Sequence, residues 1–177
     1  MIPKIIHQIW VGEEPPQFIK EAMESVQKLN PDFEYKFWGN EHIPQFKLEN
    51  VFKESLTISF AVNVMQLKIL EEYGGLYIDA DTFCEKPLNE WFQKYTKYPL
   101  SSTHIKNQYP DMGIVIAKPH LNYKIFLADY NYKTPAGFYW QRLKPHLIPE
   151  EEVGPNGIYL KDLQLNSWVK KYEESQS

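Results

Sequence analysis

The sequence contains very little cysteine and arginine, and both shortages restrict its chemistry. Cys84 is the only cysteine in 177 residues, so no internal disulfide can form, which fits a reducing compartment. Arg142 is the only arginine, and every other basic side chain is a lysine. Several bidentate guanidinium contacts to a diphosphate are therefore not available, and we expect a metal ion to neutralise such a ligand.

Long apolar runs and an excess of positive charge are also missing. No run approaches the length of a membrane span, and the first residues lack a signal-peptide pattern. We therefore expect a cytoplasmic protein without a transmembrane segment, and peripheral association with a membrane surface remains open. The net charge of -4 gives no footprint for a nucleic-acid backbone. With 43% hydrophobic residues, the chain is expected to form one packed domain.

The acidic stretch Tyr73–Phe83, with the sequence YGGLYIDADTF, is the strongest local signal. A long amphipathic run ends at Gly74-Gly75, and Leu76–Ile78 predict a short buried strand. Asp79 and Asp81 follow at its carboxyl end, where ligands bind in open α/β sheets. One of the two carboxylates can hold Mg²⁺ or Mn²⁺ while the other meets a different ligand group. The D-x-D spacing is also common in solvated turns, so the spacing alone leaves both interpretations open.

Hydrophobic periodicity predicts an alternation of strands and helices. Strands are predicted at Lys4–Trp10, Phe33–Trp38, Leu76–Ile78, Lys97–Thr103 and Gly113–Ala117. Helices are predicted at Gln17–Leu29, Ser55–Tyr73, Asn89–Tyr95, Leu121–Tyr132 and Ile158–Trp168. Gly39–Glu54 is expected to be loop with one short turn of helix, and Pro110-Asp111 to be a turn. The strand–helix–strand order of the first forty residues predicts a right-handed βαβ unit and an α/β fold.

Three segments occur together in an uncommon combination: IPKIIHQIW at Ile2–Trp10, Asn30-Pro31 with the aromatic strand to Trp38, and YGGLYIDAD at Tyr73–Asp81. This combination resembles the glycosyltransferases with a DXD-containing sugar-binding region. That family includes initiating mannosyltransferases, capsular-polysaccharide transferases and, more distantly, the clostridial glucosylating toxins. The resemblance covers residues 1–90, and more weakly the strand Gly113–Ala117 and the turn at Gly154-Pro155.

The resemblance implies a fold and a reaction. The fold is the GT-A type, an α/β fold with a Rossmann-like central sheet flanked by helices. The implied reaction transfers a hexose from a UDP- or GDP-sugar, bound with Mn²⁺ or Mg²⁺, to a saccharide or other hydroxyl acceptor with retention, as in polysaccharide biosynthesis. Residues 1–90 would then form the nucleotide-sugar half of a single domain, and residues 91–177 a reduced acceptor half.

The resemblance also implies roles for individual residues. Asp81 corresponds to the main metal ligand, and Asp79 to a second acidic residue that touches ribose or sugar hydroxyls; the two form the implied catalytic pair. His7 and Trp10 correspond to part of the nucleotide pocket, with Trp10 offering a stacking face for the base. Gly75 belongs to the same donor-binding set. A structural histidine and a core tryptophan are the alternatives for His7 and Trp10.

One departure from the family pattern lies on the predicted helix Ser55–Tyr73. Family members usually have Ser-Asp-x-x-Arg where this chain has Val62–Gln66, so Asn63 replaces the acidic residue and Gln66 the basic one. Residues three apart on a helix can reach each other, and an amide–amide hydrogen bond can replace an ion pair without leaving a charge unpaired. Both residues are expected near the donor, and the alternative is that they are ordinary boundary residues.

Two other functions remain as alternatives. The stretch ending in Asp79-Ala80-Asp81-Thr82 also fits the DxDxT motif of haloacid-dehalogenase-like phosphatases, in which the first aspartate is the nucleophile. That motif normally opens a domain and requires a later acidic pair, whereas this chain offers only Lys118 after the strand Gly113–Ala117. A non-catalytic homologue that binds nucleotide or sugar is suggested by Asn63 and Gln66, and the intact acidic pair argues against it.

Overall fold

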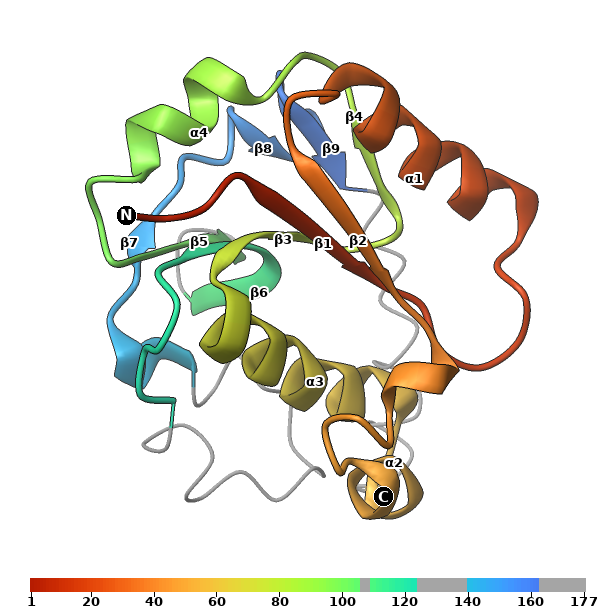
Figure 1. The fold of residues 1–177 in the computed structure, drawn as a ribbon. Helices are drawn as coiled ribbons and strands as arrows, with labels where there is room; N and C mark the ends of the chain where they lie inside the picture. The colour runs from red at the N-terminus through yellow and green to blue at the C-terminus, as the bar shows by residue number, and fades with distance from the viewer. Residues whose placement is uncertain (106–108, 124–139, 163–177) are drawn as a thin grey trace.

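The computed structural model describes residues 1–105, 109–123 and 140–162, and its centre is a six-stranded mixed sheet (Figure 1). The strand order is β2-β1-β3-β6-β5-β7. These strands are β1 (Ile5–Ile9), β2 (Glu34–Trp38), β3 (Gly75–Ile78), β5 (Leu100–Ile105), β6 (Tyr109–Ala117) and β7 (His146–Leu147). Because β1 is parallel to β2 and β3 while β6 is antiparallel to β3, three strands end and β6 begins at the same edge of the sheet.

A second, smaller sheet continues from this edge. It consists of β4 (Thr82–Cys84), β9 (Leu160–Asp162) and β8 (Val153–Gly154), in the order β4-β9-β8. Strand β4 begins directly after Asp81, and Thr82 is paired with Asp162 in the antiparallel β4–β9 register. The small sheet therefore brings the C-terminal end of the described chain beside the acidic pair.

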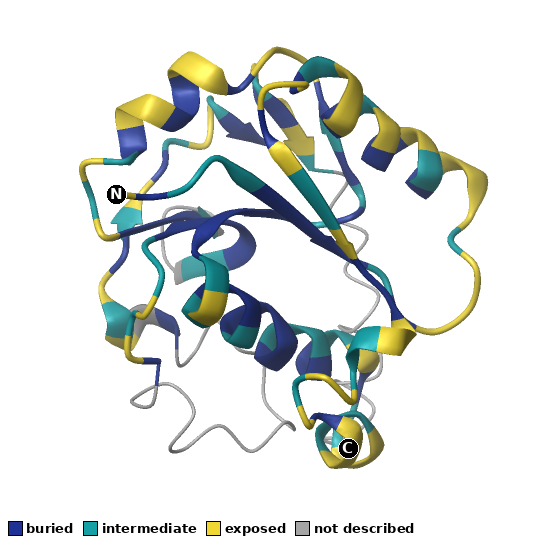
Figure 2. Ribbon diagram, viewed as in Figure 1, coloured by how far each residue is buried: buried dark blue, intermediate teal, exposed yellow. Residues whose placement is uncertain are grey.

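Helices cover both faces of the central sheet, as Figure 1 shows. Helix α3 (Ile58–Tyr73) lies on one face, and α1 (Gln17–Leu29) and α4 (Asn89–Tyr95) lie on the other with the small sheet. Alternating side chains of β3 serve the two cores: Tyr77 packs in the α3 core, and Leu76 and Ile78 in the α4 core. In Figure 2, α3 is mostly buried, whereas α1 exposes its outer face.

Helix α3 leads the chain to the acidic pair, and both of its ends are defined. At its start the Thr57 hydroxyl accepts a hydrogen bond from the Phe60 amide at 3.3 Å, a typical N-cap. At its end Gly74 has φ +62, and a Cβ there would lie 2.5 Å from the Pro119 nitrogen. The glycine is therefore required both by the backbone conformation and by the close approach of the neighbouring chain.

Most of the elements expected from the sequence are present. The bounds of α1 and α4 are as predicted, the strands at β1, β2, β3, β5 and β6 are confirmed with shifted ends, and α3 begins at Ile58 instead of Ser55. The described residues contain no helix long and apolar enough to cross a membrane. The central sheet with helices on both faces agrees with the α/β architecture expected from the sequence.

Other expectations were wrong. Gly39–Glu54, predicted as loop with one short turn of helix, contains two helical segments, the 3₁₀ helix η1 (Asn40–His42) and helix α2 (Glu49–Glu54). Strand β6 begins at Tyr109, so Pro110-Asp111 lies in the strand, where proline is tolerated near its first residue and beside a register shift of β5. Where a helix was predicted from Ile158, residues Leu160–Asp162 form β9, because they pair with β4 and β8. The rest of that helix lies outside the described residues, as do residues 124–132 of the helix predicted at Leu121–Tyr132.

A candidate acidic site at the end of the central sheet

Asp79 is held at the edge of the sheet by several hydrogen bonds. Its amide donates to the Gly113 carbonyl at 2.8 Å, which extends the β3–β6 pairing by one residue. The Tyr77 hydroxyl donates to Asp79 Oδ1 at 2.7 Å, and the Gln8 side chain donates to the Asp79 carbonyl at 3.2 Å. These bonds fix the backbone of Asp79 and its Oδ1 atom, and Asp79 Oδ2 can face other partners.

Asp111, at the start of β6, brings a further carboxylate to the same place. A Cβ built on Gly113 would lie 3.0 Å from Asp111 Oδ2 and 3.1 Å from Asp79 Oδ2, so both oxygens face the space beside this glycine. The Gly113 amide donates to Asp111 Oδ2 at 3.2 Å. Sequence analysis missed Asp111 because its segment was interpreted as a turn, and only the antiparallel register with β3 brings it to the site.

The electrostatics of this edge are dominated by carboxylates. Burial raises the pKa of Asp79 well above its usual range, and the negative charges of Asp81, Asp111 and Asp162 raise it further. Burial likewise raises the pKa of Asp111, although hydrogen bonds from the backbone oppose the shift. The arrangement disfavours full ionisation and therefore favours the binding of a cation.

Hard oxygen donors suit Mg²⁺ or Mn²⁺, and the structure limits how many of them the protein supplies. Among the described residues, no group of three His, Cys, Asp or Glu side chains is arranged to hold a metal ion. Mg²⁺ is commonly held by one or two carboxylates, with water and substrate phosphates completing its shell. Asp79 and Asp81 fit that kind of site, and Asp79 Oδ2 and Asp111 Oδ2 both lie close to Gly113.

Trp10 lies beside the acidic pair. Its ring packs against Ile19, Met23 and Ala80, and Ala80 is the residue between the two aspartates. The indole N–H donates to the Glu13 carbonyl at 2.7 Å, and the ring keeps partial solvent access. The predicted stacking on a nucleotide base stays a prediction, and the position of Trp10 suits it.

His7 and Gly75 have structural positions, which corrects their expected place in the donor pocket. His7 is fully buried. The Trp38 indole donates to its Nδ1 at 3.2 Å, so Nε2 carries the proton and donates to the Gly74 carbonyl at 2.8 Å. Burial lowers the pKa of His7 to about 4, so the ring is neutral and has no free nitrogen for a ligand. Gly75 allows β1 to approach, because a Cβ there would lie 2.6 Å from the Ile5 carbonyl oxygen.

Gln66 also departs from the expectation. It is fully buried, its amide nitrogen donates to the Met112 carbonyl at 2.8 Å, and its oxygen has no hydrogen-bond partner within the described part of the chain. The hypothesis of an Asn63–Gln66 hydrogen bond is therefore wrong. Asn63 is half-buried one turn earlier on α3. Gln66 supports the residue between Asp111 and Gly113, and in this way it reaches the site indirectly.

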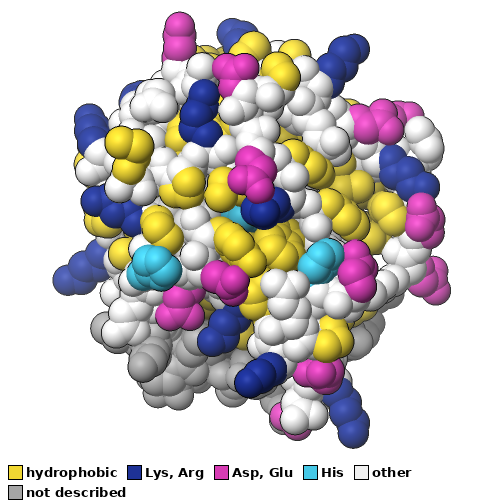
Figure 3. All heavy atoms as spheres, viewed as in Figure 1, with side chains coloured by type: hydrophobic (Ala, Val, Ile, Leu, Met, Phe, Trp, Pro, Cys, Tyr) yellow, Lys and Arg dark blue, Asp and Glu magenta, His cyan; other side chains and the backbone are white. Residues whose placement is uncertain are grey.

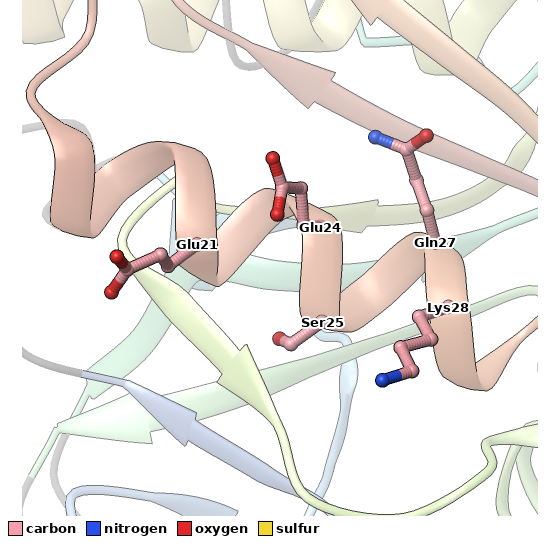
Figure 4. Close-up of a pocket in the computed structure, with 5 residues that line it drawn as sticks. All are labelled: Glu21, Glu24, Ser25, Gln27 and Lys28. Carbon is pink, nitrogen blue, oxygen red and sulfur yellow. The ribbon is translucent and has the colours of Figure 1, made fainter.

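The surface elsewhere carries less specific features. On the face in Figure 3, basic and acidic side chains are interspersed around a central apolar area. A hollow of about 610 Å³ runs along α1, and Figure 4 shows side chains of both charges extending from that helix beside it. Its lining residues are Glu21, Glu24, Ser25, Gln27 and Lys28. It contains none of the predicted site residues.

Known proteins share both the sequence pattern and the fold. Residues 16–98 match the family described as glycosyltransferase sugar-binding region containing DXD motif. Inositol phosphoceramide mannosyltransferase 2 of Schizosaccharomyces pombe is 35% identical over 164 residues, which are 89% of this chain and 45% of that protein. The uncharacterized glycosyltransferase L373 of Acanthamoeba polyphaga mimivirus is 31% identical over 148 residues, which are 76% of this chain and 55% of that protein. The chain thus spans about half the length of these two relatives.

Among solved structures, the galactosyltransferase LgtC in complex with donor and acceptor sugar analogs superposes with a TM-score of 0.61 at 11% identity, over 96% of this chain and 94% of that chain. The PaToxG glycosyltransferase superposes with a TM-score of 0.55 at 15% identity, over 99% of this chain and 74% of that chain. These similarities show that the fold is the GT-A type expected from the resemblance. The matched region, which includes Asp79 and Asp81, and the sequence relatives support a glycosyltransferase family for this chain, one whose sugar-binding region contains a DXD motif.

Proposed function

We propose that this protein is a metal-dependent glycosyltransferase that moves a hexose from a nucleotide-sugar to a hydroxyl acceptor with retention. The observation that carries the proposal is the position of Asp79 and Asp81 at the carboxyl edge of β3, beside the start of β6. In open α/β sheets this edge is where ligands bind. The sequence relatives of the chain are glycosyltransferases, which supports the same reaction class.

The acidic residues divide the work in this proposal. Asp81 would hold a Mn²⁺ or Mg²⁺ ion, which would supply positive charge to the departing nucleoside diphosphate. Tyr77 fixes one oxygen of Asp79, so the other oxygen, with that of Asp111, accepts hydrogen bonds from donor hydroxyls in the space beside Gly113. A retaining transfer in which the acceptor attacks from the leaving-group side requires no separate base from the protein.

The relatives suggest which substrates to test first. The Schizosaccharomyces pombe relative is named an inositol phosphoceramide mannosyltransferase, which supports a mannosyl donor and an acceptor with several hydroxyl groups. We propose a cytoplasmic location, which the single cysteine supports. A UDP-hexose donor with a saccharide acceptor is the second donor–acceptor combination to test.

The substitutions at Asn63 and Gln66 support a second candidate, a homologue that binds the donor without turnover. The intact acidic pair Asp79 and Asp81 favours the catalytic proposal, because a homologue without turnover has no need to keep it. The phosphatase alternative receives less support from the structure, since β3 is the third strand along the chain and does not open the domain.

The decisive experiment compares the variant Asp81→Ala with the control variant Asp32→Ala. Asp32 is an exposed aspartate outside the acidic pair, and its side chain forms an ion pair with Lys4 at 3.9 Å. Nucleoside diphosphate with Mn²⁺ at 100 times its Kd should stabilise the wild type by about 2.7 kcal/mol, or about 5–10 °C in Tm. We expect Asp32→Ala to keep this shift and Asp81→Ala to lose it.

Turnover is measured in parallel as release of nucleoside diphosphate from UDP- and GDP-hexoses. Release by the wild type supports the transferase, and binding without release supports the non-catalytic homologue. A nucleotide-dependent shift that survives in Asp81→Ala would contradict the proposed role of Asp81. Hydrolysis of an aryl phosphate that depends on Asp79 would establish the phosphatase instead.

A further inference from the structure

The loop that follows β1 is held by the side chain of Asn40, the first residue of η1, which follows β2. The Gly12 amide donates to Asn40 Oδ1 at 2.8 Å, and Asn40 Nδ2 donates to the Gly12 carbonyl at 2.9 Å. The parallel β1–β2 register ends at the pair Ile9 and Trp38, after which the two chains separate. A carboxamide offers one acceptor and a donor group in one plane, so Asn40 pairs with Gly12 as a further backbone residue of β2 would.

The conformation of this loop makes the side-chain pairing important. Gly12 has φ +106, a conformation that other residues rarely adopt. A Cβ on Gly12 would lie 3.6 Å from Ile58 Cδ1, so the loop also approaches the first residue of α3. Both bonds to Asn40 join residues that are exposed and 28 positions apart in sequence, which makes them long-range restraints on a surface loop.

The restrained loop carries the aromatic ring beside the acidic pair. Trp10 lies two residues before Gly12, and its indole N–H donates to the carbonyl of Glu13, one residue after Gly12, at 2.7 Å. Trp10 packs against the cluster formed by Ile19, Met23 and Ala80, and Ala80 lies between the two aspartates. The backbone of Gly12 therefore lies within the short loop that sets the orientation of the Trp10 ring.

We propose that Asn40 is a positioning residue for nucleotide binding: its carboxamide holds the Trp10–Glu13 loop, and through it the Trp10 ring, in the binding conformation before the donor arrives. The inference rests on the proposed function, since it requires that Trp10 faces the nucleotide. A loop that is already ordered loses less conformational freedom on binding, so the restraint increases affinity. Exposed hydrogen bonds contribute little to global stability, so their loss should appear in binding more than in Tm.

The test uses Asn40→Ala, which removes both bonds, and Asn40→Asp, which keeps the acceptor for the Gly12 amide but places an oxygen against the Gly12 carbonyl. The matched control is Asn89→Ala, because Asn89 also makes an exposed long-range bond, to Asp32 at 3.5 Å. Calorimetry measures the affinity for nucleoside diphosphate with Mn²⁺, spin resonance measures the affinity for Mn²⁺ alone, and amide hydrogen exchange is followed at Gly12.

We expect both Asn40 variants to bind the nucleotide about tenfold more weakly, which corresponds to about 1.4 kcal/mol, the order of one net hydrogen bond. Affinity for Mn²⁺ alone and Tm should stay unchanged, and exchange at Gly12 should become faster. The control should match the wild type in every measurement.

Each contrary result has a separate meaning. Wild-type nucleotide affinity in both Asn40 variants would overturn the inference, as would an equal loss of affinity for Mn²⁺ alone or a large fall in Tm, since either indicates general damage. Unchanged exchange at Gly12 would also overturn it. If the wild type itself binds no nucleotide, the proposed function fails, and the Gly12 exchange still decides whether Asn40 holds the loop.

Discussion

Gly113→Ala tests whether the space between Asp79 and Asp111 belongs to the ligand. The added methyl group would lie 3.1 Å and 3.0 Å from the two carboxylate oxygens, tighter than ordinary contacts, so both side chains must shift by a few tenths of an ångström. Overpacking of this kind destabilises by about 1–3 kcal/mol, and the lower entropy of the unfolded alanine chain offsets about 0.4–1 kcal/mol. We expect a net loss of about 0–2.6 kcal/mol in the free energy of unfolding and, in addition, weaker ligand binding.

The assay compares Gly113→Ala with Gly39→Ala, because both glycines face a carboxylate. A Cβ on Gly39 would meet Glu41 Oε2 at 2.5 Å, but that oxygen ends an exposed and flexible side chain that can move away. Calorimetric titration with Mn²⁺ and nucleotide-sugar should show about tenfold weaker binding for Gly113→Ala and unchanged binding for Gly39→Ala, where tenfold corresponds to about 1.4 kcal/mol. Equal affinities in the wild type and both variants would refute the idea that Asp79 and Asp111 share a ligand space.

Two further predictions concern the support of the site. Tyr77→Phe removes the donor to Asp79 Oδ1; we expect about tenfold weaker Mn²⁺-dependent nucleotide binding by calorimetry, since hydrogen bonds to charged groups contribute about 1.5–3 kcal/mol, and unchanged affinity would contradict the role of Tyr77. Above pH 6.5 His7 is neutral in both the folded and the unfolded protein. Below pH 6.5 His7 binds a proton in the unfolded chain, whereas in the folded protein it stays neutral down to about pH 4. The wild type should therefore lose about 3 kcal/mol relative to His7→Gln between pH 7 and pH 4, measured by urea unfolding; parallel pH profiles of the two proteins would contradict the burial of a neutral His7.

Local sequence pattern was sufficient to predict the helices and the strand that lead to the site. Helix α1 has its predicted bounds because apolar residues recur at helical spacing on one face, and Gly74 marks the end of α3 because its backbone conformation favours glycine. The acidic pair was found because a short apolar strand precedes it. These signals lie within a few residues of the features that they predict, so tertiary structure did not override them.

The missed features all depend on partners far along the chain. Asp111 joins the site only through the antiparallel register of β3 and β6, and Pro110 made its segment resemble a turn. Residues from Leu160 form a strand because β4 and β8 lie on either side, and no local pattern records that pairing. His7 was expected in the pocket, and only the positions of Trp38 and Gly74 show that both ring nitrogens are occupied.

The replaced pair on α3 gains a physical interpretation from these contacts. Gln66 is fully buried, and a charged side chain there would need a buried counter-charge, whereas an amide reaches the Met112 carbonyl without one. The cost is a buried amide oxygen that has no hydrogen-bond partner in the described part of the chain, about 1–3 kcal/mol. Burial and the neighbouring carboxylates together raise the pKa of Asp79 and oppose its ionisation in the free protein. A divalent ion of the kind proposed above would offset that repulsion, so the proposed metal–diphosphate complex and the acidic cluster would stabilise each other.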